Sequence, residues 1–112
     1  MSIAGDLIRG HTDAIILARL LRGDSYGYEI NKTISTLSSG RFELKEATLY
    51  TAFKRLEEQG YIASYWGDSG AGARRRYYTI TAAGRDASRR LVAEWLETKE
   101  IMDNLLKTEA EI

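Results

Sequence analysis

One stretch of the sequence, EATLYTAFKRLEEQGYI at residues 46–62, carries side chains that could contact a nucleic acid. At about 100° per residue, four of its apolar residues share one side of a helix, which can pack into a core: Leu49, Ala52, Phe53 and Leu56. The opposite side and its flanks carry small, hydroxyl and cationic residues: Ala47, Thr48, Tyr50, Thr51, Lys54 and Arg55. Small residues permit close approach to base edges, hydroxyls form hydrogen bonds, and cations pair with phosphates. An ordinary solvated helix is the alternative, although such a helix would carry denser Glu/Lys pairing.

A run of three arginines, Arg74, Arg75 and Arg76, opens the segment RRRYYTI. Residues 74–90 hold six arginines against one aspartate, a balance of +5, while residues 94–112 hold six acidic residues against two lysines, a balance of −4. The formal net charge of zero therefore conceals one basic and one acidic region. Such a separation suits a chain that presents a basic surface to a polyanion. The alternative for the arginines is a solvated strand end.

The composition argues against several other classes of function. The 112 residues contain no cysteine and a single histidine, His11, so we expect no disulfide, no metal site and no cofactor. No nucleophile stands beside a histidine, and the stretch GDSGAGA lacks the Lys-Ser/Thr of a phosphate-binding loop, so no enzyme is expected. No apolar run reaches the roughly 20 residues of a membrane span, and the first residues lack the features of a signal peptide. We expect a cytoplasmic protein with no membrane partner.

Apolar residues recur at helical spacing in three segments: residues 11–22, 24–37 and 46–59. The segments that follow them have the composition of strands. The first is expected to be capped by Thr12 or Asp13, and the second near Asp24 or Ser25. Gly60 suits the left-handed conformation that commonly ends a helix, so the third should end there. Lys45 precedes the third helix, where a capping side chain would be favoured, so its start depends on Glu46 at the positive end of the helix dipole.

The segments YIASYW and RRRYYTI are rich in aromatic and β-branched residues and flank a glycine-rich loop, which predicts a β-hairpin. Thr81 can cap a last, long helix. Three helices followed by a hairpin is the order of a winged helix-turn-helix, whose third helix enters the DNA major groove while the hairpin follows the backbone. We therefore expect an α+β, mostly α fold. A winged helix-turn-helix DNA-binding domain should span residues 1–80, and a C-terminal dimerisation helix with an acidic tail should span 81–112.

The predicted last helix has a wide apolar side that a small chain cannot cover by itself. The residues expected on this side are Leu91, Trp95, Met102, Leu105 and Leu106. We therefore expect a homodimer in which this side meets a second copy. Trp66 is expected to pack at the base of the wing. Four tyrosines are expected to be packing groups and not readers of bases: Tyr26, Tyr28, Tyr61 and Tyr77.

Three motifs, SYGYEI, EATLYTAFKRLEEQGYI and RRRYYTITAAG, resemble the signature of PadR-type transcriptional regulators. The short C-terminal helix is similar to that of the small, second PadR subfamily, which includes a multidrug-binding repressor. The resemblance covers residues 5–107. It implies a homodimeric repressor that binds a pseudo-palindromic double-stranded DNA operator. It also implies a planar aromatic, hydrophobic effector held between a pair of tryptophans at the dimer interface.

The resemblance also implies which residues would hold the effector. Trp95 matches the ligand-stacking tryptophan, and four residues match positions that line the pocket: Leu7, Gly10, Asp13 and Ala14. Lys99 stands one turn after Trp95, where the multidrug-binding relative has an acid suited to cationic drugs. Asp6 and Asp13 could restore a negative potential, or the effector could be neutral or anionic. A winged-helix module that binds protein instead of DNA, without a small-molecule ligand, is the alternative function, since one fold serves both.

Overall fold

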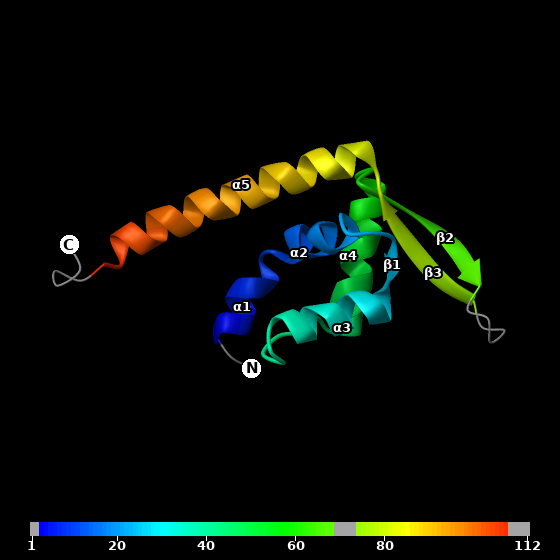
Figure 1. The fold of residues 1–112 in the computed structure, drawn as a ribbon, viewed down its shortest axis with the longest axis horizontal. Coiled ribbons are helices and arrows are strands. Elements are labelled where there is room, and N and C mark those ends of the chain that lie inside the picture. The colour runs from blue at the N-terminus through cyan, green and yellow to red at the C-terminus, as the bar shows by residue number, and fades with distance from the viewer. Residues whose placement is uncertain (1–2, 69–73, 108–112) are drawn as a thin grey trace.

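The computed structural model describes residues 3–68 and 74–107. In this part of the chain five helices and three strands follow one another (Figure 1): α1 (Ile3–Arg9), α2 (Thr12–Leu20), β1 (Ser25–Tyr26), α3 (Gly27–Leu37), α4 (Glu46–Glu58), β2 (Ile62–Asp68), β3 (Arg74–Ile80) and α5 (Ala82–Leu105). The expected α+β, mostly α class with a winged helix-turn-helix is confirmed. The predicted glycine loop, GDSGAGA at 67–73, starts too early, because Gly67 and Asp68 continue strand β2 in its pairing with β3. The rest of that loop, 69–73, and the acidic tail from 108 lie outside the described residues. Among the described helices, none combines the length and apolar character of a membrane span.

The first predicted helix is preceded by another, α1, that the sequence pattern did not indicate. The chain turns between α1 and α2 at Gly10 and His11, where the His11 N–H donates to the Ile8 carbonyl at 2.8 Å. Thr12 Oγ1 donates to the Arg9 carbonyl at 2.7 Å, and α2 has no side-chain cap. The cap predicted at Thr12 or Asp13 was therefore wrong, because the Thr12 hydroxyl closes the turn between the two helices instead.

The second predicted helix starts later than expected, because the residues before it form a strand. Ser25 pairs with Tyr78, and Tyr26 pairs with Tyr77, which makes a three-stranded antiparallel sheet of order β1-β3-β2. The cap predicted near Asp24 or Ser25 was wrong, since α3 begins at Gly27. The free edge of β3 satisfies the backbone groups of β1, and a local sequence pattern does not reveal that pairing.

The connection from α3 to α4 is held by side-chain hydrogen bonds. Asn31 Nδ2 donates to the Leu44 carbonyl at 2.7 Å, and the Leu44 N–H donates to Asn31 Oδ1 at 2.8 Å. Helix α4 then begins after Lys45 without a side-chain cap, as the sequence indicated, with Glu46 in its first turn. It ends before Gly60, whose φ of 79° is the predicted left-handed conformation. The start and end of α4 are thus both determined locally.

The core lies where α2, α3, α4 and the start of α5 meet the sheet. Its buried hydrophobic residues are Ile16, Leu17, Leu20, Ile30, Ile34, Phe42, Leu44, Leu49, Ala52, Phe53, Leu56, Ile62, Tyr78, Ile80 and Ala87. Within it, Phe53 of α4 stacks on Tyr78 of β3 with ring centroids 3.9 Å apart. This contact joins α4 directly to the sheet.

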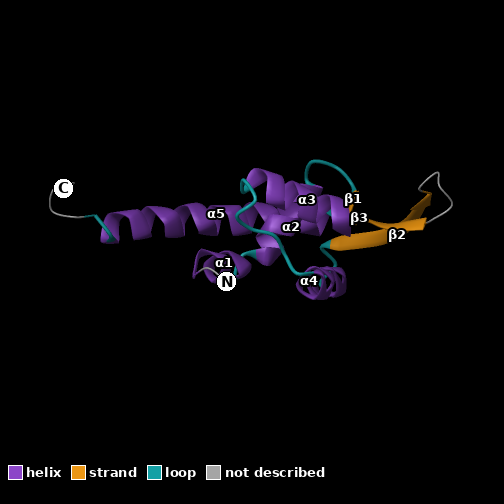
Figure 2. Cartoon of the chain, turned by 90° about the horizontal axis from the view of Figure 1, so that it is seen from below, coloured by secondary structure: helices purple, strands orange, loops and turns teal. Residues whose placement is uncertain are grey.

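Helix α5 begins in the core and then leaves it. Thr81 caps it as predicted, since its Oγ1 accepts from the Gly84 N–H at 3.0 Å. Ala87 and Ser88 are buried, but the C-terminal half extends beyond the other helices (Figures 1 and 2). The radius of gyration is 16.3 Å, whereas a compact chain of this length would have about 13 Å. The far half of α5 is therefore a long surface that the described chain leaves uncovered.

We predict that Gly84→Ala destabilises the fold, because α5 passes very close to the end of α4. A Cβ at Gly84 would lie 2.0 Å from the Tyr61 carbonyl oxygen, a backbone atom that cannot rotate away. Overpacking of this kind costs about 1–3 kcal/mol, measurable by denaturant unfolding. Gly10→Ala is the matched control, because the nearest atom to its Cβ would be 3.4 Å away. Equal stability of the two variants would contradict the close approach.

Candidate nucleic-acid interface

Helix α4 has one buried and one open side. Leu49, Ala52, Phe53 and Leu56 are each at most 2% exposed, so the predicted core stripe is the buried one. The predicted reading side lies outward, with Ala47, Tyr50, Thr51, Lys54 and Arg55 exposed and Thr48 half-buried. Small and hydroxyl side chains at the centre of this side leave room for a close approach by a partner. Packing of the inner stripe therefore determines which residues α4 presents.

The three arginines of the wing stand at the start of β3 and alternate between the two faces of the sheet. Arg74 and Arg76 lie beside Trp66, with guanidinium carbons 5.4 Å and 5.9 Å from the ring centroid. Arg75 lies over the ring of Tyr26 at 4.6 Å. These distances allow cation–π contacts, which hold the guanidinium groups near the sheet without neutralising their charge.

Arg76 has further partners on the side that faces α4. It pairs with Glu57 at 3.4 Å and donates to Ser64 Oγ at 2.9 Å. Arg74 and Arg75 have no ion pair with any residue that the structure describes. Their charges are therefore more available to a polyanion than that of Arg76.

A concave surface of about 580 Å³ lies between the wing, the start of α3 and one flank of α4. We call it the wing cleft; its residues are Tyr26, Gly27, Tyr28, Tyr50, Trp66, Arg74, Arg75, Arg76 and Tyr78. Gly27 permits the close approach of α4, since a Cβ there would lie 2.7 Å from the Tyr50 hydroxyl. The cleft thus combines aromatic surface, the hydroxyls of four tyrosines and three guanidinium groups.

Two aromatic residues of the wing cleft were misplaced by the sequence analysis. Tyr28 is 72% exposed, although it was expected to be a packing group, and Trp66 is 56% exposed, although it was expected to pack at the base of the wing. Tyr28 lies off the buried stripe of α3, which helical spacing from Ile30 and Ile34 could have indicated. Trp66 shares a strand face with the buried Ile62, but the sheet extends beyond the core at that point. Strand alternation alone could not show this.

The other flank of α4 borders a second hollow of about 370 Å³, which we call the α1–α4 hollow. Its residues are Arg9, Thr12, Ala47, Thr48, Thr51 and Arg55. Sequence analysis missed Arg9 and Thr12, because only the turn between α1 and α2 brings them beside α4. Helix α4 therefore lies between two concave surfaces, each with guanidinium groups.

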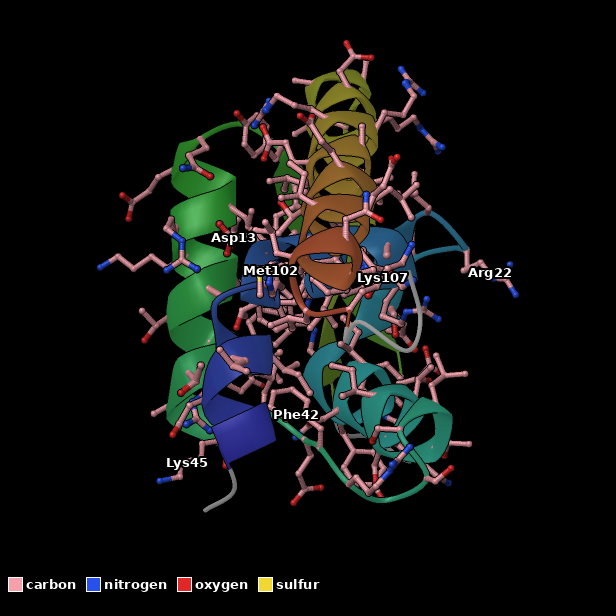
Figure 3. The ribbon with its side chains drawn as sticks, turned by 90° about the vertical axis from the view of Figure 1, so that its left-hand side faces the viewer. Asp13, Arg22, Phe42, Lys45, Met102 and Lys107 are labelled. Atoms are coloured by element: carbon pink, nitrogen blue, oxygen red, sulfur yellow. The ribbon has the colours of Figure 1, made fainter. Side chains whose placement is uncertain are left out.

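Arg55 is paired with Asp13 of α2 across this flank. Arg55 Nε lies 3.3 Å from Asp13 Oδ2, and a second guanidinium nitrogen contacts the other carboxylate oxygen. The hydrogen bond from Arg55 to Asp13 raises the pKa of Arg55, so the guanidinium stays charged. Figure 3 shows Asp13 beside α4. Arg9 is paired in the same way with Asp6. The two acidic residues considered as sources of negative potential for a cationic ligand are thus both paired with arginine.

Trp95 of α5 stands at the boundary of two further cavities. It is 46% exposed, and its ring lies against His11, with centroids 5.1 Å apart in an edge-to-face arrangement. The first, the apolar cavity of about 410 Å³, is lined by Ile8, His11, Ala14, Ile15, Ala18, Arg19, Ile34, Leu37, Ser38, Phe42, Leu91, Val92 and Trp95. The second, the polar cavity of about 420 Å³, is lined by Arg9, Gly10, His11, Thr12, Asp13, Ala14, Arg55, Leu91, Glu94, Trp95 and Thr98.

The structure brings some of the predicted effector residues together and leaves others apart. Gly10, Asp13 and Ala14 line the polar cavity beside Trp95. Leu7, which is 70% exposed, and Lys99 line neither cavity within the described chain. Lys99 instead pairs with Asp103 on α5 at 3.2 Å.

The predicted dimer residues divide into two groups along α5. Leu91 is partly buried against the core of its own chain, so part of its side chain already packs within the monomer. Trp95 and Met102 are about half exposed, and Leu105 and Leu106 are 72% and 69% exposed. Only the second group offers a free apolar surface.

Comparison with known proteins identifies this arrangement. Residues 16–90 match the model of the transcriptional regulator PadR-like family. The chain belongs to the PadR-like family. A protein of Lysinibacillus sphaericus is 48% identical over 101 residues, covering 90% of this chain and 93% of that one. Members of the PadR-like family are regulators of transcription that bind DNA, not enzymes.

Two solved structures extend the comparison to the whole fold. A transcriptional regulator from Clostridium thermocellum is 45% identical with a TM-score of 0.85, covering 95% of this chain and 100% of that one. A PadR family regulator from Clostridium difficile R20291 is 37% identical with a TM-score of 0.75, covering 87% and 99%. These shares of the chain are too large to leave α5 out entirely, so each match extends beyond the winged helix-turn-helix into that helix.

Lys54→Ala tests whether the open side of α4 contacts DNA. Lys54 is exposed on α4 and has no ion pair with a described residue, so its loss should not disturb the fold. We expect weaker DNA binding by fluorescence anisotropy, with the slope of log K against log salt reduced by about 0.9 if Lys54 neutralises one phosphate. Arg22→Ala is the control, because Figure 3 shows Arg22 on the side of the molecule away from α4. Unchanged affinity in Lys54→Ala would remove this residue from the interface.

Proposed function

We propose that this PadR-like regulator is a homodimeric repressor that binds a pseudo-palindromic operator and is released by a flat, hydrophobic aromatic effector stacked on Trp95. The observation that carries the proposal is the ion pair between Asp13 and Arg55. Both residues line the polar cavity beside Trp95, and Arg55 also borders the open side of α4. An effector in the polar cavity would therefore meet a side chain that also belongs to the DNA-facing helix.

In this proposal α4 lies in the major groove and the wing follows the backbone. Ala47 is suited to a thymine methyl group, and the hydroxyls of Thr48 and Thr51 to base edges. Lys54 and Arg55 would reach phosphates or guanine, and the Tyr50 hydroxyl would reach a phosphate. The wing arginines, Arg74, Arg75 and Arg76, would contact the backbone and position the protein without reading sequence. The exposure of these residues supports the assignment.

The homodimer would form through the uncovered half of α5. The long apolar surface of this helix supports the assignment, since large exposed apolar patches are uncommon on monomers. Residues 1–80 would then act as the DNA-binding unit and 81–112 as the dimerisation helix with its acidic tail. Two α4 helices related by a twofold axis would contact half-sites about 34 Å apart, one turn of DNA.

The effector would stack on the indole of Trp95, with its partner's Trp95 on the other side. A cation over an indole gains only ~0.5–2 kcal/mol, so apolar burial must supply the rest of the affinity. Gly10, Asp13 and Ala14 would line the pocket beside the ring, and Leu7 and Lys99 would join it only across the dimer. Because Asp13 is already paired with Arg55, a cationic effector would have to compete for that carboxylate.

We expect Leu105→Glu to break the dimer, because it places a charge on the apolar end of α5. Sedimentation velocity should show monomers at concentrations where the parent chain is dimeric. Asn104→Glu, the same charge one residue earlier on an exposed position, should leave the dimer intact. A dimer that survives Leu105→Glu would show that another surface joins the subunits.

Titration with a planar cationic dye tests the effector site. Quenching of tryptophan fluorescence should saturate in the parent protein and be lost in Trp95→Ala, while Trp66 supplies the background in both. The same dye should release the protein from an operator selected from a pool of random duplexes. Saturable quenching in both proteins, or release that does not require Trp95, would contradict the assignment.

Salt dependence distinguishes DNA binding by the open side of α4 from binding of a protein there. With Z phosphates neutralised, log K should fall against log salt with a slope of about −0.9Z. Association with a protein partner would respond less steeply.

A further inference from the structure

We propose that the α1–α4 hollow is a second phosphate-binding site, for the DNA strand opposite the one that the wing contacts, with Arg9 and Arg55 as its phosphate ligands. This inference rests on the proposed function, since it requires α4 to lie in the major groove. It adds a phosphate site outside the wing, on the flank of α4 that carries Arg55, and it adds Arg9 to the DNA-binding residues.

The position of the hollow carries the inference. An α-helix with its side chains is about 10–12 Å across and nearly fills the B-DNA major groove, which is about 12 Å wide, so a sugar-phosphate backbone runs along each flank of the helix. On one flank of α4 lies the wing cleft with its three arginines. On the other flank lies the α1–α4 hollow with Arg9 and Arg55. Each strand would thus meet guanidinium groups.

The chemistry of the hollow suits a phosphate. Two guanidinium groups flank it, and Thr48 and Thr51 of α4 lie between them with Thr12 of α2. Guanidinium groups bind phosphate oxygens through paired hydrogen bonds, so Arg9 and Arg55 would supply the phosphate contacts. The Thr12 hydroxyl already donates to the Arg9 carbonyl. Ala47 also lines the hollow, and its small side chain leaves room for a backbone to approach α4.

Both arginines are paired with carboxylates in the free protein, so removing a carboxylate should change the affinity for DNA. Arg9 pairs with Asp6, and Arg55 pairs with Asp13. All four side chains are at least 30% exposed, so these pairs are weak and a phosphate can compete for the arginines. When Arg55 turns to a phosphate, the carboxylate of Asp13 is left near the DNA and must take up a cation. Asp13 should therefore oppose DNA binding, although it stabilises Arg55 in the free protein.

Arg9→Ala tests the site itself. Binding to duplexes of any sequence should weaken several-fold, and the salt slope should fall in magnitude by about 0.9 for one lost phosphate contact. Arg22→Ala is the matched control, because Figure 3 shows Arg22 on the side of the molecule away from α4. Thermal unfolding of each variant verifies that the fold is retained.

Asp13→Asn tests the role of the Asp13–Arg55 ion pair. Its expected effect on DNA affinity is the opposite of that of Arg9→Ala. It should raise DNA affinity several-fold and steepen the salt slope by about 0.9, because no cation is then taken up at this position. Asp86→Asn, which breaks the exposed pair with Arg89 on α5, is the control and should change neither quantity. A loss in Arg9→Ala together with a gain in Asp13→Asn supports the second site.

Unchanged binding in Arg9→Ala, or unchanged or weaker binding in Asp13→Asn, overturns it. Lys54→Ala, measured beside them, separates this failure from a failure of the proposed function. If Lys54→Ala weakens binding while the other two variants behave as the parent, α4 still contacts DNA and only the second site is wrong. If all three leave binding unchanged, α4 is not the DNA-contacting helix, and both inferences fail.

Discussion

The stacking of Phe53 on Tyr78, with ring centroids 3.9 Å apart, fixes the one relation on which the rest of the interface depends. Because Phe53 belongs to the buried stripe of α4 and Tyr78 to the central strand β3, their contact sets the helix and the wing relative to each other. The outward side of α4 is then defined by what the inner side buries. Tyr50 continues this aromatic contact, lying edge-to-face with Phe53 at 5.5 Å, and reaches the wing cleft from the core.

The arginines around α4 are held in the free protein in two different ways. Arg55 forms an ion pair with Asp13, whereas Arg74 and Arg75 lie against aromatic rings. Arg76 is held in both ways, by Glu57 and by the ring of Trp66. A cation–π contact leaves the charge of the guanidinium unpaired, while a carboxylate neutralises it. Arg74 and Arg75 of the wing therefore present unpaired charge to the solvent, whereas an anion must displace a carboxylate from Arg55 or Arg76. A chain of zero formal net charge can bind a polyanion by this arrangement.

Much of the architecture could be predicted because it depends on neighbours in the sequence. The buried stripe of α4, the left-handed Gly60 that follows it and the Thr81 cap of α5 each follow from spacing within a few residues. Strand β1 could not be predicted in this way, since Ser25 and Tyr26 become a strand only by pairing with residues some fifty positions later. Trp66 was misplaced for a related reason, because strand alternation gives a face but not the point at which the core beneath it ends.

The sequence by itself determined the winged helix-turn-helix, the side of α4 that faces outward and the PadR-like resemblance, because periodicity and motif are local properties of a chain. Only the tertiary structure decided what surrounds α4. It brought Arg9 and Asp13 beside that helix through the turn between α1 and α2, and it placed Trp95 between an apolar and a polar cavity. These neighbours come from distant segments of the chain. Their proximity depends on how helices pack, which no spacing within one segment encodes.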